Sequence, residues 1–409
     1  MNLESPHAPS ASSLAVLSTL LLLAGCANHA PPKVDETRVR QFAGRGYLSD
    51  DRFAISTTFA SWRVGEYAFD IALTTPVSGN ALPVVVYLPG LGESRSAGES
   101  WRTSWAQAGY AVLSVQLLDD DQKARSSGAA RRGDFAGAAR ARYAGEAATA
   151  RLKALAALLG ELQKRQAGGD ALLRRFDLTH VALAGFDIGA HAAMLAAGET
   201  PKGNAAPVSL PIPIAAIVAL SPYADFSGSA ISARYQAIAL PVLSISGDAD
   251  SDAAGVVASP SIRKAPFEYM PSKDAYLLWL GNATHAVFSG GAPTSGEASS
   301  EADTGRQSAG QSANQGAHKG GSRRGGRSSQ GGEKGDSGMA GSDSENGRIG
   351  GGRLDAATSP TDRAMNVSLV QGVTTAFLDS YLKADSIAQE WLRKDARRWI
   401  GGRGELKRK

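Results

Sequence analysis

The sequence predicts an α/β protein with a mostly parallel central sheet and helices on both faces. Apolar runs typical of buried strands recur along the chain and begin near Val84, Ala111, Val181, Ala215, Val242 and Tyr276. Helical patterns lie between them, including a stripe of leucines over residues 152–162. This alternation favours parallel strands joined by helical crossovers. The chain has 409 residues, 43% of them hydrophobic, which is enough for one large domain.

The N-terminus resembles a bacterial lipoprotein signal peptide. Its apolar run over residues 14–23 is too short to span a bilayer and leads to the chain's single cysteine, Cys26. We therefore expect residues 1–25 to be removed and Cys26 to be lipidated, which would anchor the protein in the cell envelope, on the periplasmic face of the outer membrane. Residues 1–10 lack the Lys or Arg that usually begins such a signal. Residues 26–48 are expected to form a tether.

Two antiparallel strands are expected next, over residues 53–62 and 67–75, where apolar and polar residues alternate. The following strand, at 84–88, leads into the turn Pro89-Gly90-Leu91-Gly92. A glycine-rich turn after the third strand can supply a backbone N–H to an oxyanion hole, a set of donors that stabilises a developing negative charge. The turn is therefore a candidate part of an active site.

The most specific motif is Gly185-Phe186-Asp187-Ile188-Gly189, between an apolar strand pattern and a helix of small residues. The pattern Gly-x-nucleophile-x-Gly is typical of a nucleophile elbow, a sharp turn from strand to helix in which glycines leave room for a strained residue. Asp187 stands where a serine is usual. Because aspartate tolerates positive φ better than most residues, we expect the turn to form.

An acid and a histidine follow the elbow. The strand near Val242 leads into Gly247-Asp248-Ala249-Asp250-Ser251-Asp252, and the strand near Tyr276 leads to His285. The order nucleophile, acid, histidine is that of α/β-hydrolases and differs from the orders in chymotrypsin and subtilisin. Spacing from Gly247 favours Asp250 over Asp248 and Asp252 as the acid.

The three aspartates also resemble the start of a calcium-binding loop. In such a loop the sixth position is glycine and the twelfth is glutamate. Here these positions hold Ala253 and Ser259. We therefore predict no metal site.

Together these motifs resemble bacterial α/β-hydrolases of the group that includes dienelactone hydrolases, cutinase-like polyester hydrolases and platelet-activating-factor acetylhydrolases. The resemblance covers roughly residues 50–288 and 361–400. It implies an α/β-hydrolase fold over 49–289 that is completed by a C-terminal helical part, 361–400. No separate cap domain is expected, because only residues 225–240 separate the sixth and seventh strands.

The resemblance also implies the roles of the site residues. Asp187 takes the nucleophile position, Asp250 the acid position and His285 the base position. Leu91 and Ile188 would supply the two oxyanion N–H groups. The implied substrate is a small or lipid-like carboxylic ester, and the reaction needs no cofactor.

Asp187 leaves three functions open. A carboxylate attacks an sp3 carbon in haloalkane dehalogenases and epoxide hydrolases, and a histidine-activated water then hydrolyses the alkyl-enzyme ester. Those enzymes carry a cap, and many have a Trp after the nucleophile, where this chain has Ile188. Alternatively, Asp187 orients a water for His285 in ester hydrolysis. The third function is ligand or partner binding by a degenerate hydrolase. We expect a hydrolase of the carboxylic-ester type.

The remaining segments are expected to border the site or to lie outside the core. Residues 290–360 hold no aromatic residue and consist mainly of Gly, Ser and mixed charge, which predicts a disordered insertion. The Arg- and Asp-rich stretch 119–142 is expected to border the pocket as a lid. Residues 401–409 are expected to form a basic tail.

The net charge of +4 is concentrated at the C-terminus. Residues 393–409 contain eight Lys or Arg and two acidic residues, so the rest of the chain is close to neutral. A basic terminus of this kind is typical of a solvated segment. An exported lipoprotein meets no nucleic acid in its compartment, so the expected partners are an ester substrate and a membrane reached through Cys26.

Overall fold

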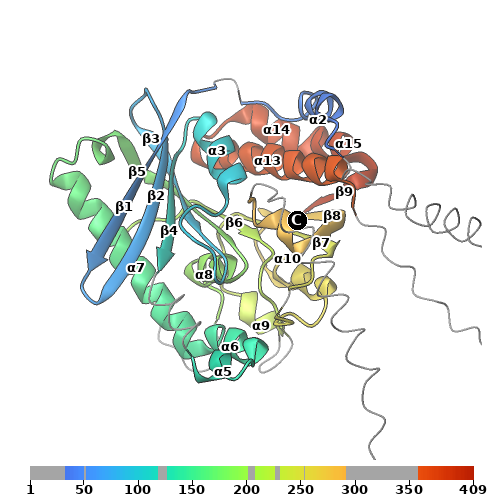
Figure 1. Ribbon diagram of the computed structural model, residues 1–409. Coiled ribbons are helices and arrows are strands. Elements are labelled where there is room, and N and C mark those ends of the chain that lie inside the picture. The colour runs from blue at the N-terminus through green and yellow to red at the C-terminus, as the bar shows by residue number, and fades with distance from the viewer. Residues whose placement is uncertain are drawn as a thin grey trace, which may run out of the picture.

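A nine-stranded, mostly parallel sheet forms the centre of the protein in a computed structural model (Figure 1). The structure describes residues 33–49, 52–117, 127–200, 208–225, 231–252, 254–291 and 358–409. The strands are β1 (Ile55–Val64), β2 (Tyr67–Pro76), β3 (Leu82–Leu88), β4 (Ala111–Leu117), β5 (Phe176–Phe186), β6 (Ala216–Leu220), β7 (Val242–Ala249), β8 (Ala275–Thr284) and β9 (Gly404–Arg408). Their spatial order is β1-β2-β4-β3-β5-β6-β7-β8-β9.

The six central strands, β4-β3-β5-β6-β7-β8, pair in parallel with their neighbours. The β1–β2, β2–β4 and β8–β9 pairs are antiparallel. The predicted α/β class with a mostly parallel sheet is thus confirmed. A parallel pairing places the carboxyl ends of neighbouring strands at one edge of the sheet, where ligands bind in open α/β sheets. This edge carries the loops after β3, β5, β7 and β8.

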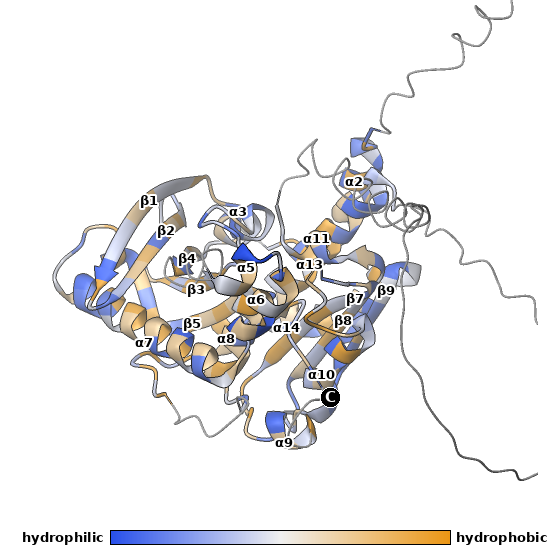
Figure 2. Ribbon diagram, turned by 60° about the horizontal axis from the view of Figure 1, so that its bottom comes forward, coloured by the Kyte–Doolittle hydropathy of each residue, from blue (hydrophilic) through white to orange (hydrophobic). Residues whose placement is uncertain are grey.

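Helices cover both faces of the sheet. They are α2 (Glu36–Ala43), α3 (Glu99–Gln107), α5 (Gly128–Arg131), α6 (Phe135–Arg142), α7 (Gly145–Ala167), α8 (Ile188–Ala196), α9 (Ile231–Tyr235), α10 (Ala265–Tyr269), α11 (His285–Phe288), α13 (Pro360–Leu382), α14 (Ser386–Lys394) and α15 (Ala396–Ile400). Along β3, Val84 and Val86 pack into the core that includes α7 and α8, whereas Val85 and Tyr87 pack toward α3 and α13. Figure 2 shows alternating apolar and polar bands along α7, as expected for a helix with one buried face.

The structure corrects the expected tether, residues 26–48, at its C-terminal end. Within this range α2 forms a helix that is capped by the Asp35 carboxylate. Phe42 of α2 stacks on Trp399 with ring centroids 5.2 Å apart. The end of the presumed tether is therefore part of the folded domain, because the one buried aromatic residue of this polar helix finds a partner more than 300 residues away. Residues 1–32, including the expected signal peptide and Cys26, lie outside the described residues.

The C-terminus is likewise not a free basic tail. Residues 404–408 form β9, which pairs with β8 from Leu280↔Gly404 to Tyr276↔Arg408. Leu406 is buried at 2% exposure, while the basic residues beside it remain at the surface. One inward apolar side chain and the backbone hydrogen bonds of the sheet edge are enough to order this charged segment. In the part of the chain that the structure describes, no helix is both long and apolar enough to cross a bilayer.

Most of the expected insertion, residues 292–357, lies outside the described residues, but its two flanks are anchored. Gly290 accepts a hydrogen bond from the backbone N–H of Ser100, and the Thr358 hydroxyl donates to the carbonyl oxygen of Asn282 at 2.8 Å. The Ser359 hydroxyl caps α13 by accepting from Asp362 N. The long helix α13 therefore begins directly after the insertion.

Replacing residues 292–357 by a short Gly-Ser linker is expected to change the melting temperature by only a few degrees. The removed sequence is poor in apolar residues and adds little to a core, and both anchored flanks are kept. Thermal unfolding followed by circular dichroism measures the effect. A matched deletion of 292–361 also removes Ser359 and the contact of Thr361 with Asp35 N, so it should melt lower. Equal, large losses in both variants would contradict the prediction.

Candidate active site

Asp187 occupies a sharp turn between β5 and α8, as the motif predicts. Its backbone has φ 54° and ψ −113°, a conformation that costs about 1–3 kcal/mol for a residue with a side chain. Asp187 N donates to Leu220 O, and His191 N donates to Asp187 O, both at 3.0 Å. These two bonds hold the strained residue at the carboxyl edge of the sheet.

The two glycines of the motif are needed for close backbone contact. A Cβ atom on Gly189 would overlap the carbonyl group of Leu88 at the end of β3. One on Gly185 would overlap the backbone of Gly189. The elbow therefore packs directly on the turn that follows β3.

Gly189→Ala is expected to destabilise the protein by about 3 kcal/mol, because backbone atoms cannot yield as a flexible side chain does. The same substitution at Gly402, where a Cβ atom would meet nothing within 4 Å, is the matched control and should have little effect. Unfolding in guanidinium chloride measures both free energies of unfolding. A Gly189 variant as stable as the parent would show that the elbow is looser than the structure indicates.

Both oxygens of the Asp187 carboxylate accept hydrogen bonds. Tyr143 Oη donates to Oδ1 at 2.5 Å, and the backbone N–H of Leu91 donates to Oδ2 at 3.4 Å. Ile188, the other expected oxyanion residue, is the first residue of α8, where backbone N–H groups lack partners within the helix. The structure thus brings Leu91 and Ile188 to the elbow, and the Leu91 N–H faces the carboxylate itself.

Tyr143 is a site residue that the sequence reasoning missed. Its side chain is buried and lies against Tyr223, with ring centroids 4.3 Å apart, and stacks on His191 at 5.6 Å. Burial raises the pKa of Tyr143 well above its usual value, and the negative charge of Asp187 and the hydrogen bond to it raise it further. Tyr143 is therefore held as a neutral phenol that points its proton at Asp187.

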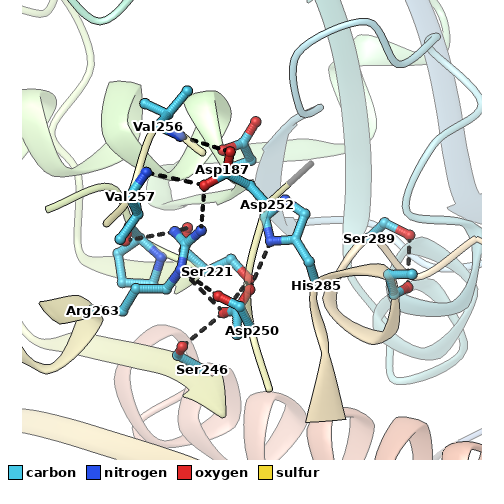
Figure 3. A network of polar contacts seen from close by, with 12 residues as sticks. Asp187, Ser221, Ser246, Asp250, Asp252, Val256, Val257, Arg263, His285 and Ser289 are labelled. Carbon is cyan, nitrogen blue, oxygen red and sulfur yellow. Dashed lines mark hydrogen bonds and ion pairs between the residues drawn. The ribbon is translucent and has the colours of Figure 1, made fainter. Parts of the chain in front are cut away.

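The His285 imidazole and the Asp250 carboxylate form a hydrogen-bonded pair. His285 Nδ1 lies 2.7 Å from Asp250 Oδ1, and Asp250 is fully buried (Figure 3). Ala249 of β7 pairs with Thr284 of β8, so the residues that follow them, Asp250 and His285, lie side by side. His285 also packs on Phe186, the residue before Asp187, with ring centroids 4.7 Å apart. The strand register therefore places the pair next to the elbow.

Polar groups around Asp250 keep it ionised. The hydroxyls of Ser221 and Ser246 each donate to Oδ2 at 2.7 Å, and Arg263 Nε lies 3.5 Å from the same atom (Figure 3). Burial by itself would raise the pKa of Asp250, but the hydrogen bond to His285 and the charge of Arg263 hold it below its usual value. A carboxylate at this position fixes the imidazole tautomer and stabilises a positive charge on the ring.

The neighbouring aspartates have other partners. Asp248 accepts from the backbone N–H of Asn282 at 2.6 Å. Asp252 accepts from Val256 N and Val257 N at 2.9 and 3.0 Å. Of the three aspartates that the sequence offered, Asp250 is thus the one that contacts His285.

Arg151 of α7 adds a buried positive charge that sequence reasoning also missed. Its Nη2 donates to the carbonyl oxygen of Arg142 at 2.9 Å. Burial lowers the pKa of Arg151 to about 10, and the nearby Asp187 carboxylate acts in the opposite direction. The only sequence signal for these residues was the lid-like stretch 119–142, which ends directly before Tyr143. Residues 119–126 of that stretch lie outside the described part of the chain, and the rest contains α5 and α6.

Within the described ranges, no group of three His, Cys, Asp or Glu side chains is placed to hold a metal ion. The chemistry available at the elbow is that of one half-buried carboxylate, a histidine–aspartate pair, a phenol and backbone N–H donors. No protein-family model and no curated protein matches this sequence.

Proposed function

We propose that the protein is a hydrolase of the α/β-hydrolase fold in which the Asp187 carboxylate is the nucleophile and attacks an electrophilic sp3 carbon, as in an epoxide. The observation that carries this proposal is the bond from Leu91 N–H to Asp187 Oδ2. When water hydrolyses an ester formed on Asp187, the oxyanion develops on the Asp187 carboxyl group itself. A donor that faces Oδ2 is placed to stabilise that charge.

The order and position of the motifs support the fold assignment. The donor turn follows β3, the elbow follows β5, the acid follows β7 and the histidine follows β8. In α/β-hydrolases the oxyanion hole combines an N–H from the loop after the third strand with that of the residue after the nucleophile. Leu91 and Ile188 occupy these two positions.

In the first step, Asp187 Oδ1 forms a bond to the epoxide carbon while the bond from that carbon to the epoxide oxygen breaks. The oxygen takes the electron pair and the proton of Tyr143 Oη, which lies 2.5 Å from Oδ1 in the free protein. Ester formation removes the negative charge of Asp187, which is one cause of the raised pKa of Tyr143. The phenol therefore becomes a better acid at the moment when its proton is needed.

In the second step, His285 takes a proton from a water molecule that attacks the carbonyl carbon of the Asp187 ester. Asp250 stabilises the resulting imidazolium through the 2.7 Å contact with Nδ1. The tetrahedral intermediate then releases the alcohol, which takes the proton from His285, and the Asp187 carboxyl group returns its proton to Tyr143. The net reaction is the addition of water across the epoxide.

Tyr143 is placed to stabilise the leaving group, a role that the cap domain has in haloalkane dehalogenases and epoxide hydrolases. In cap-bearing relatives, the cap after the sixth strand stabilises the leaving group. Here a phenol from the segment between β4 and β5 lies at the nucleophile instead. No Trp follows Asp187, and the Tyr143 phenol is placed to deliver the proton that an alkoxide leaving group needs. Both observations favour an epoxide over an alkyl halide.

A single turnover of a 1,2-epoxyalkane in 18O-labelled water tests the proposal. With excess enzyme, the diol should contain oxygen from Asp187, and the label should enter the peptide that contains Asp187. Peptide mass spectrometry locates the label. If the label goes only into the diol, water attacks the substrate directly and Asp187 is not the nucleophile.

Carboxylic-ester hydrolysis remains the second candidate. Its support is that the His285–Asp250 pair and the Leu91 and Ile188 donor positions are those of a serine esterase with Asp187 in place of serine. In that reaction Asp187 would orient the water that His285 activates. Hydrolysis of p-nitrophenyl acetate without label in Asp187 would favour this candidate. Turnover of neither substrate would favour a binding protein.

A further inference from the structure

An apolar pocket opens beside the elbow, between the sheet edge and α7. The pocket is narrow, with an accessible volume of about 50 Å³. The turn Pro89–Gly92 forms one wall. Apolar side chains of β2, β4, α7 and α8 form much of the remaining lining, including Phe69, Val115, Leu117, Leu155, Leu158 and Ile188.

Two polar side chains belong to this otherwise apolar lining, Gln116 and Arg151, and each donates a hydrogen bond to the backbone. Gln116 Nε2 donates to Leu117 O at 3.4 Å, and Arg151 Nη2 donates to Arg142 O at 2.9 Å. A ligand in this pocket is therefore recognised mainly by apolar contact. The side chains around it are close to fully buried, for example Leu158 at 0% and Ile188 at 5% exposure, so a slim group fits better than a bulky one.

The pocket shares residues with the site, including both oxyanion candidates. Leu91 directs its N–H at Asp187 Oδ2, and Ile188 directly follows Asp187; both also line the pocket. A substituent on a carbon bound to Asp187 can therefore extend past the turn Pro89–Gly92 into the pocket without crossing a helix.

We propose that this pocket binds an unbranched alkyl chain carried by the substrate. That the alkyl chain belongs to a substrate rests on the proposed function, whereas binding of the chain by the pocket does not. Each methylene that leaves water for the pocket should strengthen binding roughly four-fold until the pocket is full. The substrates are then terminal epoxides, or esters, with a linear chain.

Two substitutions on α7 test the proposal in opposite directions. Ala154→Phe fills the pocket, and Leu155→Ala enlarges it, since both residues line it. Ala150→Phe, at an exposed position of the same helix, is the matched control. Binding of 1-alkanols with two to ten carbons is measured by thermal shift, and turnover is measured with 1,2-epoxyalkanes and p-nitrophenyl esters of the same lengths.

The expected result is a preferred chain length that becomes shorter in Ala154→Phe, longer in Leu155→Ala and unchanged in Ala150→Phe. If Ala154→Phe fails to fold, the longer preferred chain length expected for Leu155→Ala still tests the pocket assignment. Alkanol binding with this pattern and no turnover would refute the proposed function while the pocket assignment stands. Alkanol binding that is absent, independent of chain length or unaffected by Leu155→Ala would overturn the pocket assignment.

Discussion

His285→Ala is expected to stop the reaction after its first step and to leave the substrate's alkyl group bonded to Asp187. The first step uses Asp187 and Tyr143, whereas hydrolysis of the ester needs a base that activates water. Loss of a general base commonly slows a reaction by roughly 10²–10⁴-fold. Intact-mass spectrometry should show the protein heavier by one epoxide, and peptide mapping should place the adduct on Asp187.

Two controls make this result specific. Asp187→Asn removes the nucleophile and should give no adduct under the same conditions. His180→Ala changes an exposed histidine that contacts Asp177, away from the elbow, and should turn over like the parent. An adduct on any residue other than Asp187 would contradict the mechanism, as would full turnover by His285→Ala.

Asp187→Ser is expected to abolish epoxide hydrolysis and to create or raise hydrolysis of short activated esters. The substitution removes the carboxylate that Leu91 N–H contacts at 3.4 Å, so the donor becomes available to the oxyanion of an ester substrate. Oxyanion donors of this kind are commonly worth roughly 100- to 1,000-fold in rate. The His285–Asp250 pair is already in place to take the serine proton. Release of p-nitrophenol from p-nitrophenyl acetate measures the gain.

The double variant Asp187→Ser, His285→Ala tests whether the new activity uses the site as described. It should lose the gained esterase activity, because serine then lacks its base. A parent that hydrolyses esters efficiently and loses this activity in Asp187→Ser would show a direct role for the carboxylate in ester cleavage. The epoxide assignment would then give way to the ester one.

Local sequence patterns predicted the fold class and three elements of the site. Buried parallel strands appear as short apolar runs, and an elbow that packs backbone on backbone requires glycine at 185 and 189. Both signals lie within a few neighbouring residues. The same holds for the turn at Leu91 and for His285 after β8, so these positions followed from the chain alone.

Contacts between distant segments decided the rest. Tyr143 lies 44 residues from Asp187, and Leu91 lies 96 residues from it, so no local pattern shows that both donate to the same carboxylate. The choice of Asp250 depended on the register of β7 against β8, which sets one of three nearby aspartates beside His285. For β9, a short charged segment became a strand because β8 offered an open edge. A sequence thus determines which groups are present and how each turn bends, whereas hydrogen-bond partners depend on packing between elements far apart in the chain.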